Sequence, residues 1–278
     1  MSIDYEVEYN NRARVPEHPE IFARWQRDAE AYRIEATTER RAELGFKYGP
    51  SPRQFIDLFT PKSGGANVPL AMFIHGGYWR SLEPAMFSQM ARGMNARSIT
   101  VAVAGYDLVP QVAIRDIIAQ IQAACVQLWK RFGRRIMVCG HSAGGHLAAC
   151  MLATDWKALN APADLVPSVM TISGVHDLSP LIHIANNVEF KLDAAEAKRV
   201  SPIHWTAPKG GALDAVVGGN ESAEFLRQSK IIVEAWGKDN ATRYEAAPGM
   251  NHFTVCDPMS DPGSAMTARL VALTERTR

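Results

Sequence analysis

The stretch from Arg135 to Leu152, RIMVCGHSAGGHLAACML, constrains this chain more than any other. A short apolar run leads into the pentapeptide GHSAG, centred on Ser142, and small, helix-forming residues follow it. This order predicts a strand, a very tight turn and a helix, with a serine at the tip of the turn. A serine there is strained, and side chains two positions away on either side would collide, which explains Gly140 and Gly144. The pattern G-x-S-x-G therefore predicts a nucleophilic hydroxyl above the end of a strand.

Length and composition fit one globular domain with a single large core. The chain has 278 residues, of which 47% are hydrophobic and 21% charged, and its formal net charge is +1. This balanced charge argues against nucleic-acid binding, and no apolar run approaches the roughly 20 residues of a membrane span. The polar N-terminus shows no basic and then apolar leader, so we expect a cytoplasmic protein. Reduced thiols are then expected for Cys125, Cys139, Cys150 and Cys256.

Apolar runs alternate with amphipathic stretches along most of the chain. Strands are expected over residues 54–59, 70–74, 99–104, 135–139, 168–172, 215–217 and 242–246. Helices are expected over residues 19–41, 84–97, 114–132, 145–152, 222–236 and 262–274. This alternation predicts a mostly parallel sheet with helices on both of its faces.

Two segments of the expected single domain, 1–278, fall outside this alternation. Residues 1–50 are polar and carry one helix, so they are expected to form a helical extension. Residues 178–213 show no strong strand pattern, yet they are too apolar for disorder. A connection of this length is usually functional, and we expect a small lid with helical parts. The helix that carries Trp25 is expected to pack beside the lid.

A second glycine-rich turn, HGGYW, follows the expected strand 70–74. Sites in parallel sheets lie at the carboxyl ends of the strands, so this turn and the serine turn should meet. Paired glycines let the backbone approach a substrate closely. We expect the amides of Gly77, Tyr78 and Ala143 to form an oxyanion hole. No spacing of histidine, cysteine or acidic residues indicates a metal, and no cofactor is expected.

The general base and its acid are sought on the loops that follow the later strands. His252 lies after the last expected strand, where the chain order serine, acid, histidine requires the base. Glu221 and Asp177 each follow an expected strand at the correct edge of the sheet. Glu221 is favoured as the acid, and Asp177 is the alternative. Asp214 is expected to precede its strand and so to lie at the opposite edge.

Several motifs occur together in one order: HGGYWRSL, GHSAGGHLAA, SGVHDLSPL, NESAEFLRQS and MNHF. In this combination the chain resembles the kynurenine formamidase (arylformamidase) group of α/β-hydrolases. The start, YNNRARVPEHPEIFARW, resembles bacterial esterase-like members of that group, and the similarity runs from about residue 9 to residue 271. The resemblance implies an α/β-hydrolase fold with a mostly parallel, eight-stranded sheet.

The same resemblance implies a serine hydrolase that cleaves a small carboxylic ester or an N-formyl (aryl formamide) bond through an acyl-enzyme. The nucleophile maps on Ser142, the base on His252 and the acid on Glu221, where the animal enzymes carry aspartate. Glutamate also serves as a triad acid in this fold. The partner implied is a small-molecule ester or amide, with no nucleic acid and no membrane, and a homodimer is left open.

The residues that line the substrate pocket select the substrate, and no sequence motif marks them as the triad is marked. Trp79, His176 and Phe253 are expected to shape the pocket, although group members often carry an aromatic residue where this chain has His176. The alternatives are a hydrolase of another small amide or formylated intermediate, or a non-catalytic hydrolase-fold binding protein. The binding protein is disfavoured because all three triad positions are filled.

Overall fold

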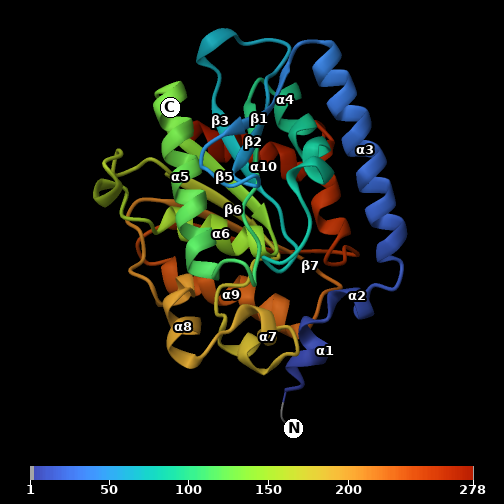
Figure 1. The fold of residues 1–278 in the computed structure, drawn as a ribbon, viewed down its shortest axis with the longest axis vertical. Helices are drawn as coiled ribbons and strands as arrows, with labels where there is room; N and C mark the ends of the chain where they lie inside the picture. The colour runs from blue at the N-terminus through green and yellow to red at the C-terminus, as the bar shows by residue number, and fades with distance from the viewer. Residues whose placement is uncertain (1–2, 278) are drawn as a thin grey trace.

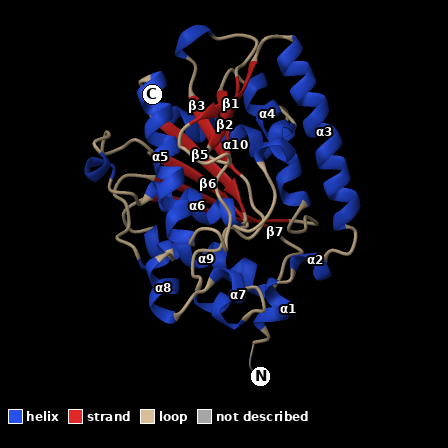
Figure 2. Ribbon diagram, viewed as in Figure 1, coloured by secondary structure: helices blue, strands red, loops and turns tan. Residues whose placement is uncertain are grey.

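Residues 3–277 are described by a computed structural model, in which a sheet lies between two layers of helices (Figures 1 and 2). The strands are β1 Ala42–Lys47, β2 Phe55–Phe59, β3 Leu70–Ile74, β4 Thr100–Ala104, β5 Ile136–His141, β6 Ser168–Ile172, β7 Ala212–Gly218 and β8 Ala241–Ala247. Their order in the eight-stranded sheet is β1-β2-β4-β3-β5-β6-β7-β8. Strands β1, β2 and β4 pair in antiparallel fashion, and all the other pairs are parallel. The expected mostly parallel, eight-stranded sheet is confirmed.

The α-helices follow the strands in the alternation that the sequence predicts. They are α1 Tyr5–Tyr9, α2 Asn11–Arg14, α3 His18–Thr38, α4 Arg92–Ala96, α5 Ile114–Phe132, α6 Ala143–Leu152, α7 Asn187–Phe190, α8 Ala194–Arg199, α9 Ala223–Trp236 and α10 Ala265–Thr274. Short 3-10 helices include Pro84–Ala91, Ser179–His183, Pro202–His204 and Thr254–Ser260.

The two faces of the sheet bury two separate hydrophobic cores. Along β3, Leu70, Met72 and Ile74 point to one core, and Ala71 and Phe73 point to the other. This alternation is the two-residue period of a strand that is buried on both faces. Helices α5, α6 and α9 cover the first face, and α3, α4 and α10 cover the second.

Some expected elements have different bounds or were missed. Strand β1 is missed because its side chains are mostly exposed and it contains Gly45, whose φ is 77°. It forms because it pairs with β2 at the edge of the sheet. The expected helix 84–97 is a 3-10 segment continued by α4. Strand β7 begins at Ala212, so Asp214 lies inside the strand instead of before it.

Residues 6–12 lie at the cavity beside the carboxyl ends of the strands, and α3 runs along the second face of the sheet. The Tyr9 hydroxyl donates to Glu224 Oε2 of α9 at 3.0 Å and accepts from Gln228 Nε2 at 2.8 Å. Trp25 of α3 is buried, and its indole N–H donates to Asp257 Oδ1 at 2.8 Å. These bonds fix the extension on the domain. No helix in the described part of the chain is long and apolar enough to cross a bilayer.

Candidate active site

The serine turn joins the end of β5 to the start of α6. Ser142 adopts φ 55° and ψ −116°, a conformation that L-residues rarely take. Its amide donates to Ile172 O at 2.8 Å, and its carbonyl accepts from His146 N at 3.1 Å. The backbone is therefore held on both sides of the strained residue. Ser142 lines a cavity, as the sharp turn of a nucleophile elbow requires.

The two glycines of the turn have no room for a side chain. A Cβ at Gly140 would lie 2.2 Å from Gly144 O, and one at Gly144 would lie 2.0 Å from Ile74 O. Both distances are far below van der Waals contact, and both obstacles are backbone atoms. The turn packs directly on the end of β3, so glycine is required at these positions for steric reasons.

Replacing Gly144 with alanine is expected to destabilise the protein by about 3 kcal/mol or to prevent folding, because the backbone must move. Urea unfolding followed by tryptophan fluorescence measures the change. The matched control is Gly263→Ala, where the nearest atom to the new Cβ would be Asp261 Oδ1 at 3.4 Å. Its stability should stay within about 1 kcal/mol of wild type. Equal stability of the two variants would show that the serine turn is not packed as described.

A carboxylate and an imidazole meet beside the serine turn. Glu221 Oε2 lies 2.6 Å from His252 Nδ1, and both side chains are almost fully buried. Glu221 Oε1 accepts from Ser173 Oγ at 2.5 Å and from Gly218 N at 2.7 Å. Both carboxylate oxygens are therefore occupied. An ionised carboxylate accepts the Nδ1 hydrogen of His252, which leaves Nε2 as the proton acceptor.

The other candidate acids lie elsewhere. Asp177 Oδ1 accepts from Ser179 N at 3.0 Å, and its Oδ2 is 3.9 Å from Arg227 Nη2. Asp214, in β7, accepts from Arg269 Nε at 2.7 Å. The structure thus brings Glu221, and not Asp177, into contact with His252.

His141 supports the loop that carries the imidazole. Its Nε2 lies 2.7 Å from His252 O. Burial, together with the neighbouring His252, holds the pKa of His141 well below its usual value. His141 is therefore neutral at neutral pH, and its Nε2–H can donate to the His252 carbonyl. His141 therefore positions the loop of His252. Both histidines line the cavity.

The HGGYW turn after β3 has three consecutive residues with positive φ: Gly77 (104°), Tyr78 (53°) and Trp79 (55°). Gly77 O accepts from Arg80 N and Ser81 N, which closes the turn. Within residues 3–277, no hydrogen bond uses the amide N–H of Gly77 or Tyr78 as donor. These amides, with that of the first residue of α6, are left to bind a ligand.

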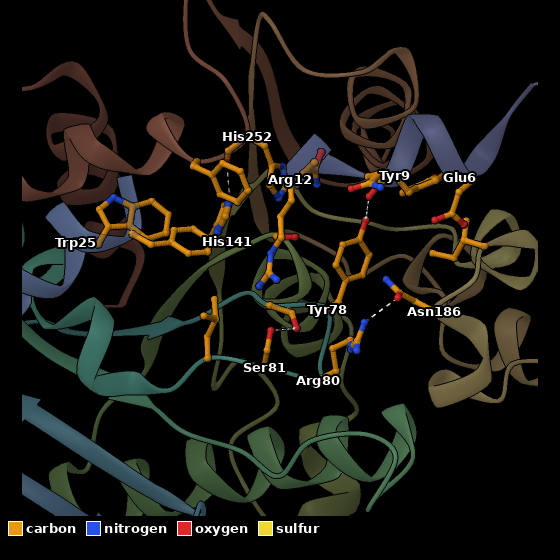
Figure 3. A pocket seen from close by; sticks show the side chains of 18 residues that line it. Glu6, Tyr9, Arg12, Trp25, Tyr78, Arg80, Ser81, His141, Asn186 and His252 are labelled. Atoms are coloured by element: carbon orange, nitrogen blue, oxygen red, sulfur yellow. Dashed lines mark hydrogen bonds between the residues drawn. The ribbon is translucent and has the colours of Figure 1, made fainter. Parts of the chain in front are cut away.

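Ser142, His252 and the HGGYW turn all line one cavity of about 330 Å³ (Figure 3). Its walls come from α1 and α2, α3, the HGGYW turn, the serine turn, the segment after β6 and the loop after β8. The lining residues are Glu6, Tyr9, Asn10, Asn11, Arg12, Phe22, Trp25, Gly77, Tyr78, Arg80, Ser81, Leu82, His141, Ser142, Ile184, Asn186, His252 and Phe253. Of the three expected pocket residues, Phe253 lines this cavity.

Trp79 and His176, the other two, do not line it and are fully buried. The Trp79 ring packs edge-on against His146 at 5.1 Å and against Phe190 at 5.9 Å. The His176 ring fills the space over Gly174, where a Cβ would lie 2.6 Å from its Cε1. Burial and the neighbouring His146 lower the pKa of His176 to about 3. The expectation that these two side chains shape the pocket is therefore corrected, because each turns into the core.

A roof over the cavity was expected from the segment 178–213 with the helix of Trp25 beside it, but its main parts differ from that expectation. The segment 9–12 and the aromatic residues Phe22 and Trp25 of α3 supply much of it, whereas the segment 178–213 supplies Ile184 and Asn186. That segment contains the short helices α7 and α8 joined by loops, and its last residues begin β7. Helical spacing identified Trp25 as buried, but not what it covers. No group of three or more potential metal ligands is found among the described residues.

Comparison with known proteins agrees with the fold. A family model described as the alpha/beta hydrolase fold matches residues 71–277, so the chain belongs to this family. Within it, the chain is similar to the kynurenine formamidases of Salmo salar and Danio rerio. Each is 26% identical, over 83% and 81% of this chain and 81% and 80% of the relative. The expected resemblance is thereby confirmed.

Solved structures extend the similarity. A proposed thioesterase from Silicibacter sp. TM1040 is 33% identical and superposes with a TM-score of 0.88, over 97% of this chain and all of that one. Esterase B of Lactobacillus rhamnosis has a TM-score of 0.65 at 19% identity, over 94% of this chain and 98% of that chain, and so shares the fold. The chain is an esterase- or formamidase-like hydrolase.

Proposed function

We propose that this protein is a serine hydrolase that cleaves a small carboxylic ester or an N-formyl aryl amide through an acyl-enzyme. One observation carries the proposal. A buried carboxylate–imidazole pair, Glu221 and His252 at 2.6 Å, faces the same cavity as Ser142 on its strained turn. The similarity to kynurenine formamidases supports the N-formyl substrate.

The mechanism assigns one step to each residue. Ser142 Oγ attacks the carbonyl carbon of the substrate while His252 Nε2 takes its proton and later gives it to the leaving group. Glu221 holds the imidazole in the required tautomer and stabilises the imidazolium. The amides of Gly77, Tyr78 and Ala143 bind the oxyanion, and one such donor contributes about 3 kcal/mol to the transition state. Water then hydrolyses the acyl-enzyme by the same steps.

The testing experiment has two parts. A fluorophosphonate probe should label the protein, and peptide mass spectrometry should place the label on Ser142. A panel of N-formylkynurenine, simpler aryl formamides, short para-nitrophenyl esters and a short acyl thioester then ranks the leaving groups by kcat/KM. A protein that takes no label and turns over no member of the panel would be a hydrolase-fold binding protein instead.

A preference for short acyl groups follows from the cavity. Its volume of about 330 Å³ lies under a roof made by the N-terminal segment, which is hydrogen-bonded to α9 and to the HGGYW turn. An acyl chain of eight or more carbons would have to displace that roof. Along a para-nitrophenyl series from acetate to palmitate, we expect kcat/KM to fall about tenfold or more by octanoate.

The same series, run below and above the solubility limit of the long esters, tests whether the roof opens at an interface. We expect no jump in rate on emulsified substrate. A maximum at eight carbons or longer, or activation by an emulsion, would contradict a fixed roof.

A further inference from the structure

Besides the histidines, three charged side chains line the cavity: Glu6, Arg12 and Arg80. Two of them already have partners within the protein. Arg80 Nη2 lies 2.5 Å from Glu189 Oε1, and its Nη1 donates to Asn186 Oδ1 at 2.7 Å. Glu6 Oε2 accepts from Ala185 N at 2.7 Å. The third, Arg12 of α2, has no hydrogen bond or ion pair with any residue between 3 and 277.

Arg12 is an exposed residue that lines the cavity, and none of its described neighbours neutralises its positive charge. Its guanidinium lies 5.9 Å from the centre of the Phe22 ring, at the wall of the cavity. Arg14, two residues later, pairs with Glu8 at 3.7 Å. In Figure 3 the side chain of Arg12 reaches from the roof, beside His252, toward the turn that carries Ser81. Tyr9 and Tyr78 lie between Arg12 and Glu6 in the same view, and no ion pair joins these two side chains among the described residues.

The residue before Arg12, Asn11, is a second polar side chain without a hydrogen-bond partner among the described residues. Asn11 is only 4% exposed and lines the same cavity, yet neither its Oδ1 nor its Nδ2 has a hydrogen-bond partner. Buried amide groups are normally satisfied, and both of these atoms have almost no accessible surface, so a ligand in the cavity can supply the bond only if the Asn11 side chain turns toward it. A cation and an amide donor side by side suit a carboxylate, which offers two acceptor oxygens.

We propose that Arg12, assisted by Asn11, binds a carboxylate on the substrate, so that the enzyme selects negatively charged esters or amides over neutral ones of the same shape. This inference rests on the proposed serine hydrolase activity in the same cavity. Arg12 is a specificity residue: it holds the substrate and takes no part in bond cleavage. Either part of the substrate, the acyl group or the leaving group, can carry this carboxylate.

Two matched pairs of esters test the inference and separate these two sources. The acyl pair is para-nitrophenyl hemisuccinate and para-nitrophenyl pentanoate. The leaving-group pair is para-acetoxybenzoate and its methyl ester. For at least one pair, wild type should favour the anionic member about 10- to 100-fold in kcat/KM, and added salt should reduce the preference.

Variants at Arg12 identify the origin of that preference. Arg12→Gln should lower the anionic-to-neutral ratio of kcat/KM about 10- to 100-fold, chiefly through KM, and Arg12→Glu should invert it. Taking the ratio cancels any general loss of activity. Arg12→Lys should keep part of the preference, because the charge remains but the planar pair of donors is lost. Arg14→Gln is the matched control and should leave the ratio within about twofold of wild type.

The outcomes separate this inference from the proposed function. If wild type hydrolyses charged and neutral esters alike, or Arg12→Gln leaves the ratio unchanged, the carboxylate site is wrong and the hydrolase assignment stands. If wild type hydrolyses no ester of either pair and takes no fluorophosphonate label, the proposed function fails and the inference fails with it.

Discussion

Ser142→Ala is expected to lower kcat on the best substrate by about 10⁴-fold or more, because no other group at the turn can form the acyl-enzyme. The protein should still fold. The strained backbone at φ 55° is imposed by β5, α6 and the hydrogen bond to Ile172, and alanine is smaller than serine. Steady-state kinetics on purified protein give the loss, and thermal unfolding by circular dichroism checks the fold.

Ser264→Ala is the control for this experiment. Ser264 caps α10 by accepting from Thr267 N at 3.0 Å, and it does not line the cavity. Its loss should cost about 1 kcal/mol of stability with kcat unchanged. The two serine variants should therefore show opposite patterns. Retention of a tenth of wild-type turnover by Ser142→Ala would remove this serine from the mechanism.

Glu221→Gln is expected to reduce kcat by about 10³- to 10⁴-fold while KM changes little. The amide keeps the size of the side chain, but it carries no charge to stabilise the imidazolium. Its NH₂ group can also turn toward His252 and select the wrong tautomer. Ser173 Oγ and Gly218 N both donate to Oε1, so they hold the amide oxygen of the variant at that position and leave its NH₂ facing His252.

Asp177→Asn is the comparison that makes this result specific. Asp177 follows the preceding strand and is the other acid that the chain order allows, but its carboxylate bonds to Ser179 N and lies near Arg227. Its kcat should stay within about threefold of wild type, with at most about 1 kcal/mol lost in stability. A larger loss for Asp177→Asn than for Glu221→Gln would show that the catalytic acid is Asp177.

We expect substrate selection to depend on a part of the molecule that is remote in sequence from these groups. The roof is built from segment 9–12 and from α3, which the network of Tyr9 with Glu224 and Gln228 ties to α9. The roof, and Arg12 in it, is therefore where experiments on substrate choice should begin.

The backbone turns and their order along the sheet could be read from the sequence. Strands β3 and β6 and helix α5 have the expected bounds, and the turns after β3 and β5 lie where expected. The reason is that such features are local. A glycine pair, a buried apolar run and a helical period are each specified within a few residues, and parallel strands place their following loops at one edge.

The tertiary structure decided what the side chains at that edge do. Glu221 and Asp177 satisfied the same rule, and only the paths of their loops bring the former to His252. Trp79 and His176 follow strands at the correct edge, yet both turn into the core. The roof closes through contacts between residues more than 200 positions apart, such as Tyr9 with Glu224. Local propensity carries no information about such contacts, because they depend on which loops the completed sheet places opposite one another.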